Sequence, residues 1–203
     1  MLNKFIFRLL SPQFKKPSGF IGKYVGNRMD KLNDHQNDWV ISLLDLHPHD
    51  IVLEIGFGTG RTIKKIVKKV PQGKIYGIDP SHTLLHVATR LLRNEVDSGK
   101  VVLQEGYVEN AEFPSDVTKV LAVHVVYFWN DLKKVFSKLY NFSAKGATIA
   151  IYYVSPILAH SREFHEYGEE EITKHLSFAG FKNVCIKKKK FGKQNGVCIL
   201  AIK

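Results

Sequence analysis

The chain of 203 residues has little cysteine and no long apolar run, and each scarcity excludes a class of protein. Its two cysteines, Cys185 and Cys198, lie too far apart in the sequence for a metal pair or a redox dithiol. We expect both to be small buried side chains in a reducing compartment. No stretch approaches the roughly 20 apolar residues that cross a bilayer. Arg8 interrupts the apolar amino-terminal segment and no small-residue cleavage site follows, so the sequence predicts a cytoplasmic protein.

Acidic residues are also scarce: 19 Asp and Glu stand against 30 Lys and Arg, which gives a net charge of +11. Such a charge permits nucleic acid, an anionic membrane surface or an acidic substrate as a partner. The basic residues are scattered, however, and the run Lys187 to Lys190 falls in a late strand-like segment. Scattered charge is typical of a solvated surface, so we do not expect nucleic acid as the main partner, although the composition leaves it open.

A metal site is not expected either. His82 and His86 have the i, i+4 spacing of a chelating pair, but no third ligand or acidic residue accompanies them in the sequence. The pattern predicts two exposed histidines on a helix.

From residue 50 onward, strand-like and helix-like segments alternate with short connections, which predicts an α/β fold with a doubly wound parallel sheet. A helix over residues 31–46 is expected before the first strand. The last two strands are separated by a turn-like segment and are expected to pair antiparallel. The expected strands cover residues 51–55, 74–78, 101–104, 119–124, 147–154, 183–189 and 197–202, and a late helix covers residues 169–179.

The strongest motif is a glycine loop that follows the first strand, reading Glu54-Ile-Gly56-Phe57-Gly58-Thr-Gly60. Glycines let the backbone turn tightly and approach a ligand closely, and the next helix offers free N–H groups at its start. A dinucleotide loop requires Gly-x-Gly-x-x-Gly, whereas this loop has Arg61 at the last of those positions. The spacing therefore favours another nucleoside cofactor.

A second motif, Asp79-Pro80-Ser81, ends the second strand about 20 residues further on. A carboxylate at this place can accept hydrogen bonds from both ribose hydroxyls of a nucleoside cofactor. Alone it indicates only a helix start, but together with the glycine loop it predicts a ribose site.

These two motifs, with the order of elements after them, resemble the class I S-adenosylmethionine (SAM)-dependent methyltransferases. The likeness covers residues 31–203 and is greatest to the branch that methylates small molecules, which includes quinone-biosynthesis enzymes. It implies a seven-stranded, mostly parallel sheet with a reversed last strand. It also implies SAM as cofactor, S-adenosylhomocysteine as product and no metal. The resemblance places the methionine part of SAM at the loop from Glu54 to Gly60, including Phe57, and the ribose at Asp79 and Pro80.

The segment from Gly106 to Pro114 resembles the loop that holds adenine in that family. The family usually has Asp where this chain has Tyr107, so the usual contact to the adenine amino group is absent. Glu109 or a backbone group is expected to replace it, and the backbone of Val108 is expected beside the adenine.

Methyl transfer from a sulfonium is an in-line displacement, for which positioning and water exclusion supply most of the catalysis. The crevice of a doubly wound sheet opens where the strand order reverses, here between the first and fourth strands. His124 follows the fourth strand and is our candidate base, with a structural histidine as the alternative. Tyr127 and Trp129 are candidate walls of the substrate pocket, with core packing as their alternative.

Residues 1–30 are rich in glycine, lysine and aromatics and show little periodicity. We interpret them as a helical lid or flap over the crevice, in which Tyr24 and Met29 contact the substrate. An alternative is peripheral contact with an anionic membrane through Phe5, Ile6 and the neighbouring lysines. Residues 31–203 then form the methyltransferase domain.

Three functions stay open at this stage. The first is methylation of a small, hydrophobic or anionic acceptor, and the second is an RNA-directed methyltransferase that uses the basic surface. The third is a catalytically silent SAM-binding module. An oxidoreductase is a weaker fourth candidate, because it would require a dinucleotide to fit a loop that has Arg61 in place of the last glycine. Methylation of a base amino group is disfavoured, because those enzymes carry an Asn/Asp-Pro-Pro-aromatic motif where this chain reads His124-Val-Val-Tyr127. The sequence does not indicate an oligomeric state.

Overall fold

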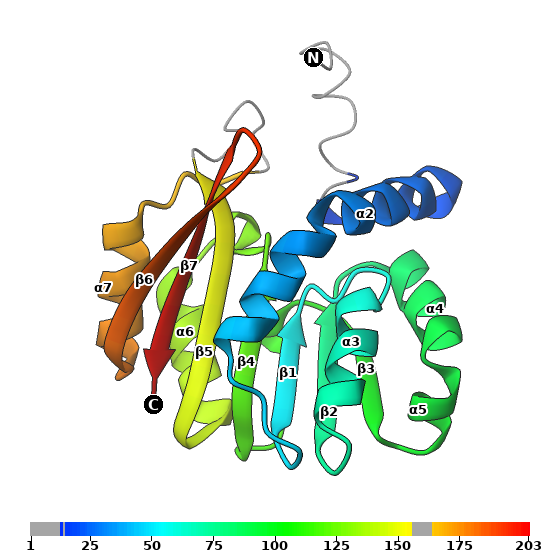
Figure 1. The fold of residues 1–203 in the computed structure, drawn as a ribbon, viewed down its shortest axis with the longest axis horizontal. Coiled ribbons are helices and arrows are strands. Elements are labelled where there is room, and N and C mark those ends of the chain that lie inside the picture. The colour runs from blue at the N-terminus through cyan, green and yellow to red at the C-terminus, as the bar shows by residue number, and fades with distance from the viewer. Residues whose placement is uncertain (1–12, 14, 156–163) are drawn as a thin grey trace.

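A computed structural model describes residues 13, 15–155 and 164–203 (Figure 1). In this part of the chain seven strands form one sheet in the order β3-β2-β1-β4-β5-β7-β6. Strands β1 to β5 pair in parallel, whereas β7 runs antiparallel to both of its neighbours. The predicted doubly wound α/β fold with a reversed last strand is confirmed. The strands are β1 (Ile51–Ile55), β2 (Lys74–Asp79), β3 (Val101–Glu105), β4 (Val117–Val123), β5 (Ser143–Ser155), β6 (Lys182–Phe191) and β7 (Gln194–Ile202).

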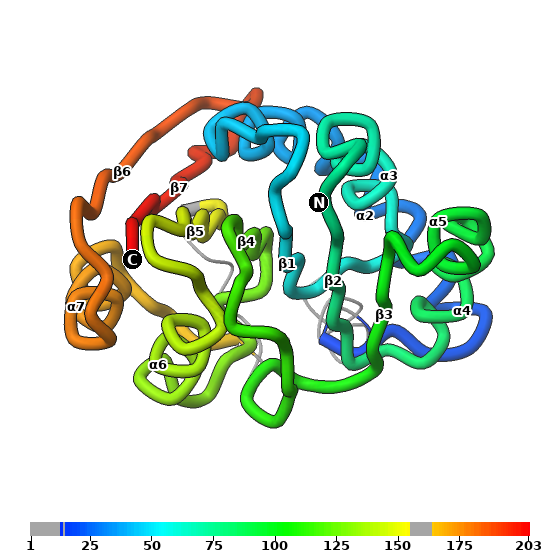
Figure 2. Tube along the Cα trace, turned by 90° about the horizontal axis from the view of Figure 1, so that it is seen from below, coloured from blue at the N-terminus to red at the C-terminus, as the bar shows by residue number. Residues whose placement is uncertain are grey.

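Helices cover both faces of the sheet (Figure 2). The central strands carry apolar side chains on each face, so both faces have to be buried. On one face Leu53, Val120 and Ile149 pack against α6 and α7. On the other face Val52 and Leu121 pack against α2, α3 and α4. These helices are α2 (Gly19–Leu43), α3 (Arg61–Lys69), α4 (His82–Leu91), α5 (Arg93–Asp97), α6 (Leu132–Phe142) and α7 (Glu169–Ala179). None of the helices in the described ranges combines the length and apolarity required to span a bilayer.

Helix α2 differs from its prediction. It begins at Gly19, not at residue 31, and runs without a break for 25 residues. The sequence predicted a helical lid or flap over residues 1–30 but no helix start at Gly19, because the side of the first half turned toward the protein carries Gly22 and Gly26 and no apolar stripe. The boundary expected at residue 30 therefore lies inside a helix. Residues 1–12, with the apolar residues of the membrane alternative, lie outside the described part of the chain.

The carboxyl-terminal hairpin forms one edge of the sheet. Its turn is only two residues, since Phe191 pairs directly with Gln194, so the predicted turn up to Gly196 was too long. Lys187 to Lys190 lie exposed on the edge strand β6, where charge discourages pairing with another chain. Cys198 is buried as predicted, but Cys185 is exposed because it lies on this edge.

Candidate functional site

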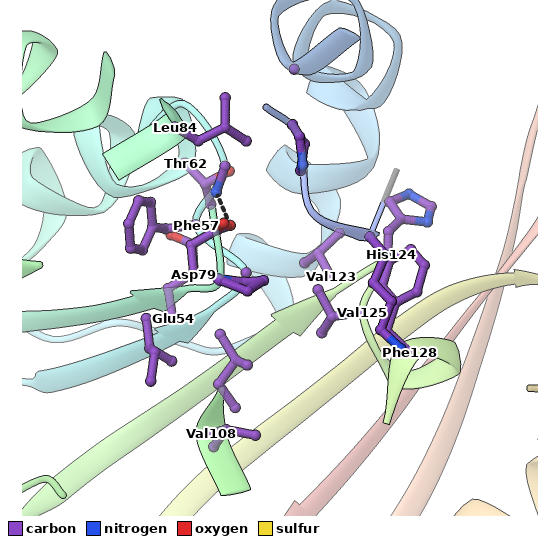
Figure 3. A pocket seen from close by; sticks show the side chains of 18 of the residues that line it. Glu54, Phe57, Thr62, Asp79, Leu84, Val108, Val123, His124, Val125 and Phe128 are labelled. Atoms are coloured by element: carbon purple, nitrogen blue, oxygen red, sulfur yellow. Dashed lines mark hydrogen bonds between the residues drawn. The ribbon is translucent and has the colours of Figure 1, made fainter. Parts of the chain in front are cut away.

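A cavity of about 130 Å³ lies at the carboxyl ends of β1, β2 and β4 and beneath the amino-terminal half of α2. Figure 3 shows Glu54, Phe57 and Asp79 on one side of it and the segment from Val123 to Phe128 on the other. This is the point where the strand order reverses, since β1 has β2 on one side and β4 on the other. The fold therefore puts the cavity where doubly wound sheets bind their ligands.

The glycine loop has a backbone that only glycine adopts easily. Gly56, Gly58 and Gly60 have φ angles of +75°, +55° and +83°. A Cβ on Gly56 would lie 2.3 Å from Cγ1 of Val125, and one on Gly60 would lie 3.0 Å from Cβ of Ala88. A Cβ on Gly58 would meet only Asp30, at 3.6 Å, so the missing side chain keeps space free in the cavity.

Asp79 is held at the tip of β2 by backbone donors. The N–H of Gly58 donates to its Oδ2 at 2.9 Å, and the N–H of Ser81 donates to its Oδ1 at 2.9 Å. Burial nevertheless raises the pKa of the Asp79 carboxyl to about 6, against the opposing effect of these two hydrogen bonds. Each oxygen keeps a lone pair for a further donor, and a ligand hydroxyl can supply it.

Two more carboxylates line the same cavity. Glu54 on β1 is only 3% exposed, its Oε2 has no hydrogen-bond partner among the described residues, and burial raises its pKa well above the ordinary value. Asp30 on α2 accepts a hydrogen bond from the hydroxyl of Thr59, and burial raises its pKa as well. Buried carboxylates of this kind suit a ligand that brings hydrogen-bond donors and positive charge.

His124 begins the loop after β4 with a left-handed backbone, φ 58°. Its Nε2 lies 2.6 Å from Oε1 of Gln36, whose own Nε2 donates to Oε1 of Gln194 at 2.8 Å. Because a carbonyl oxygen only accepts, Nε2 of His124 carries the proton and Nδ1 keeps its lone pair. Burial lowers the pKa of His124 to about 4, so the ring is neutral near pH 7.

The depressed pKa of His124 gives a direct test by NMR. We expect the imidazole signals of His124 to stay constant from pH 8 down to about pH 5, because burial excludes the charged form. Because the pKa of His124 is lower in the folded state than in the unfolded state, the free energy of unfolding decreases as the pH falls from about 6.5 to about 4. A His124 signal that shifts between pH 8 and pH 5 would contradict the assigned burial.

Most of the residues expected at the site do line this cavity. From the cofactor prediction they are Glu54, Gly56, Phe57, Gly58, Asp79, Pro80, Val108 and Glu109, and from the substrate and base predictions they are Met29, His124 and Trp129. Glu109, the expected partner of the adenine amino group, has a buried Oε2 without a hydrogen-bond partner in the described structure.

The structure places three expected residues outside the cavity lining. Tyr24 points away on α2 with 67% of its surface exposed, because it lies on the outer face of that helix. Tyr127 packs in the core against Phe128 and Phe164, which was the alternative considered for it. Gly60 is the residue before α3 and packs against α4.

Several lining residues were not predicted, and one group of them comes from α2. Asp30, Asn33 and Asn37 face the cavity from this helix, and Gly26 lies against Leu84 of α4. The sequence signal that would have found them is the helical spacing of small and polar residues at 22, 26, 30, 33 and 37.

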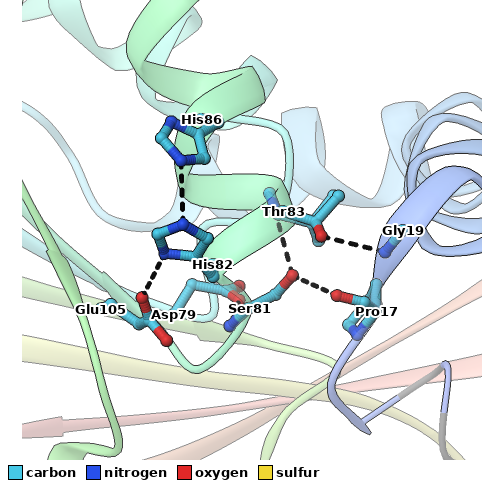
Figure 4. A network of polar contacts seen from close by, with 9 residues as sticks. Pro17, Gly19, Asp79, Ser81, His82, Thr83, His86 and Glu105 are labelled. Carbon is cyan, nitrogen blue, oxygen red and sulfur yellow. Dashed lines mark hydrogen bonds and ion pairs between the residues drawn. The ribbon is translucent and has the colours of Figure 1, made fainter.

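Helix α2 is fastened to α4 beside Asp79 (Figure 4). The hydroxyl of Ser81 donates to the carbonyl of Pro17, and the N–H of Gly19 donates to Oγ1 of Thr83 at 3.1 Å. On the outer side of α4, His82 does have an acidic partner, since its Nδ1 lies 2.7 Å from Oε2 of Glu105. His86 is bonded to His82 in turn, and no group of three metal-binding side chains occurs in the described residues.

The fold is a doubly wound α/β fold with a cavity at the strand ends, and comparisons with known proteins show what the chain is similar to. Residues 52–146 match a family model described as a methyltransferase domain. The chain is 27% identical over 172 residues to the uncharacterized methyltransferase YdaC of Bacillus subtilis, covering 84% of this chain and 93% of that protein.

Two solved structures share the fold. A SAM-dependent methyltransferase from Aquifex aeolicus has a TM-score of 0.71 at 19% identity, covering 89% of this chain and 97% of its own. A phosphoethanolamine N-methyltransferase of Haemonchus contortus, in complex with phosphomonomethylethanolamine and S-adenosylhomocysteine, has a TM-score of 0.75 at 16% identity. That likeness covers 100% of this chain and 61% of the other. Residues 52–146 therefore form a methyltransferase domain, and the chain has the fold of SAM-dependent methyltransferases.

Proposed function

We propose that this enzyme transfers a methyl group from SAM to a small-molecule acceptor bound in the same cavity. The observation that carries the proposal is the joint placement of Gly58 and Asp79, which share a hydrogen bond at the carboxyl ends of β1 and β2. The side-chain-free loop leaves room for the methionine part of SAM, and the carboxylate accepts the ribose hydroxyls.

The chemistry of the cavity fits the donor. SAM supplies a methyl group on a positively charged sulfur. Glu54 has a buried oxygen without a partner in the described structure, and Asp30 and Asp79 add two further acidic groups. The adenine is assigned to the side formed by Val108 and Glu109, with Pro80 beside the ribose.

The acceptor side is formed by the residues after β4 together with α2. Phe128 and Trp129 give an apolar wall, while Asn33 and Asn37 offer amide groups that can orient a polar acceptor. Enclosure by these side chains excludes water from the reacting groups. His124 is neutral near pH 7 and keeps the lone pair on Nδ1, and because its pKa is about 4 it is a weak base; we therefore assign it to accept a hydrogen bond from a protonated nucleophile of the acceptor.

A small acceptor fits this geometry better than RNA. The run of basic residues from Lys187 to Lys190 lies on β6, at the edge of the sheet, and β4, β5 and β7 separate it from β1 and the cavity. A nucleic-acid acceptor would be favoured by a basic surface at the cavity mouth. Lys15 is the one lysine or arginine that lines the cavity within the described residues, and it suits a single anionic group on the acceptor.

The amino-terminal half of α2, with Lys15 and Pro17 before it, acts in this proposal as the lid of the cavity. Met29 and Asn33 on its inner side then contact the acceptor. Its ties to Ser81 and Thr83 are few, so the helix can separate from α4 when ligands enter.

Calorimetry tests the donor assignment. We expect SAM and S-adenosylhomocysteine to bind at micromolar levels and NAD not to bind, because Arg61 stands where a dinucleotide loop has glycine. Burial raises the pKa of Asp79 to about 6, and its proton competes with the ligand below that value. The affinity for SAM should therefore fall about tenfold for each pH unit below about 6. Binding of NAD in preference to SAM would refute the assignment.

A further inference from the structure

The cavity holds more carboxyl groups than basic groups to pair with them. Glu54 and Asp79 are 3% and 6% exposed, and Asp30 joins them from α2. Arg61 lies 3.9 Å from Asp30 but is half exposed on the outside of the loop. Oε2 of Glu54, which has no hydrogen-bond partner among the residues that the structure describes, belongs to the same cavity lining. These acidic groups favour a ligand that carries positive charge. The proposed function gives Asp79 a partner on that ligand, the ribose, but gives none to Asp30.

Asp30 lies on the opposite side of the glycine loop from Asp79. Its Oδ2 accepts the hydroxyl of Thr59, and its Oδ1 is the atom nearest to the position that a Cβ of Gly58 would take, at 3.6 Å. Asp79 contacts the backbone N–H of that same glycine. Gly58 thus lies between two carboxylates, one from the tip of β2 and one from the helix that covers the cavity.

We propose that Asp30 binds the α-ammonium group of the donor, so that helix α2 is part of the SAM site. This inference rests on the proposed function, in which the ribose lies at Asp79 and the methionine part follows the glycine loop. A ligand placed in that way extends over Gly58 toward the helix. The positively charged ammonium group then meets Asp30, whose Oδ1 accepts no hydrogen bond from the described residues, and the carboxyl group of Glu54 lines the same cavity.

A purely structural role for Asp30 explains less. The same helix is tied to α3 by Asp34 and Asp38, which are about half exposed and both lie 2.6 Å from Nζ of Lys65. Asp30, in contrast, lines the cavity together with the buried carboxyl groups of Glu54 and Asp79, and burial of its own side chain opposes its ionisation. A neutral side chain at this position could also accept the hydrogen bond from Thr59, without the free-energy cost of burying an acidic group.

The test uses two ligands that differ in the amino group alone. S-adenosylhomocysteine and its deaminated analogue, which keeps the carboxylate, are titrated by calorimetry into the wild-type chain, Asp30→Asn and Asp34→Asn. We expect Asp30→Asn to weaken S-adenosylhomocysteine about 10- to 100-fold and the deaminated analogue less than about twofold, since a buried charge-assisted hydrogen bond is lost. Asp34→Asn is the matched control, because Lys65 keeps Asp38 as a partner, and both ligands should bind it as they bind the wild type.

The outcomes separate this inference from the proposed function. If S-adenosylhomocysteine does not bind the wild-type chain, the donor site itself is refuted. If it binds and Asp30→Asn weakens neither ligand, or weakens both equally, the ammonium assignment is overturned and Asp30 only fastens α2. Thermal unfolding of the free Asp30→Asn variant is the second readout. We expect its midpoint to equal or exceed that of the wild type, because the substitution removes repulsion from Glu54 and Asp79.

Discussion

Replacing Asp79 by Asn is expected to lower the affinity for SAM about 100- to 1,000-fold, because two charge-assisted hydrogen bonds to the ribose are lost. The amide has one acceptor oxygen, and the N–H groups of Gly58 and Ser81 both already require an acceptor at this position. The variant therefore has little acceptor capacity left for a ribose hydroxyl. Isothermal calorimetry with SAM at pH 7.5 measures the loss directly.

Glu105→Gln is the matched control for this experiment. Glu105 ends β3 directly beside Asp79 in the sheet, but its side chain is turned outward to His82 and does not line the cavity. The control removes a carboxylate from the neighbouring strand end and should leave the affinity for SAM unchanged. If the Asp79→Asn variant binds SAM as tightly as the wild type does, the ribose does not bind to this carboxylate.

Replacing Gly58 by Ala is expected to lower the affinity for SAM about 100-fold while the protein stays folded. The new methyl group would meet no atom of the protein closer than 3.6 Å, so it enters space that the cavity otherwise offers to the ligand. The left-handed backbone at this position adds a stability cost of about 1–2 kcal/mol. Binding is again measured by calorimetry, and stability by urea unfolding.

Gly99→Ala separates the two effects. Gly99 also has a left-handed backbone, φ +73°, and a Cβ there would have no neighbour within 4 Å, but it lies in the turn before β3 and far along the chain from the loop. The free energy of unfolding should decrease by a similar amount in both variants, whereas the affinity for SAM should decrease only in Gly58→Ala. A similar loss of affinity in both variants would show that backbone strain, and not blocked space, is responsible.

The central fold was predictable because its strands are buried on both faces and its helices have clear apolar stripes. Strand β1 reads as a short apolar run that ends in glycines, and α7 ends at Gly180, which takes the left-handed conformation expected of a helix stop. Strand ends were less certain. The prediction extended the fourth strand to His124, but the chain leaves the sheet after Val123, and the positive φ of His124 is a tertiary feature that propensity does not reveal.

The donor half of the site was also predictable, because its residues follow the strands in a fixed spacing that backbone geometry requires. Helix α2 was not. Its inner side faces a cavity and not a core, so Asp30, Asn33 and Asn37 replace the apolar residues that helical periodicity depends on. The outward-facing Tyr24 drew attention because it is aromatic, although aromatic character alone does not say which side of a helix a residue occupies.

Because α2 is one unbroken helix, the position of a residue along it determines whether its side chain faces the cavity. Val40 and Ile41 pack one end of the helix against the sheet, while Met29 and Asp30 lie near its middle, and each residue between them turns the helix by about 100°. A single inserted or deleted residue in this stretch would rotate the whole wall away from the glycine loop and leave the anchor in place. Variation in the acceptor pocket is therefore confined to exchanges of side chains at constant helix length.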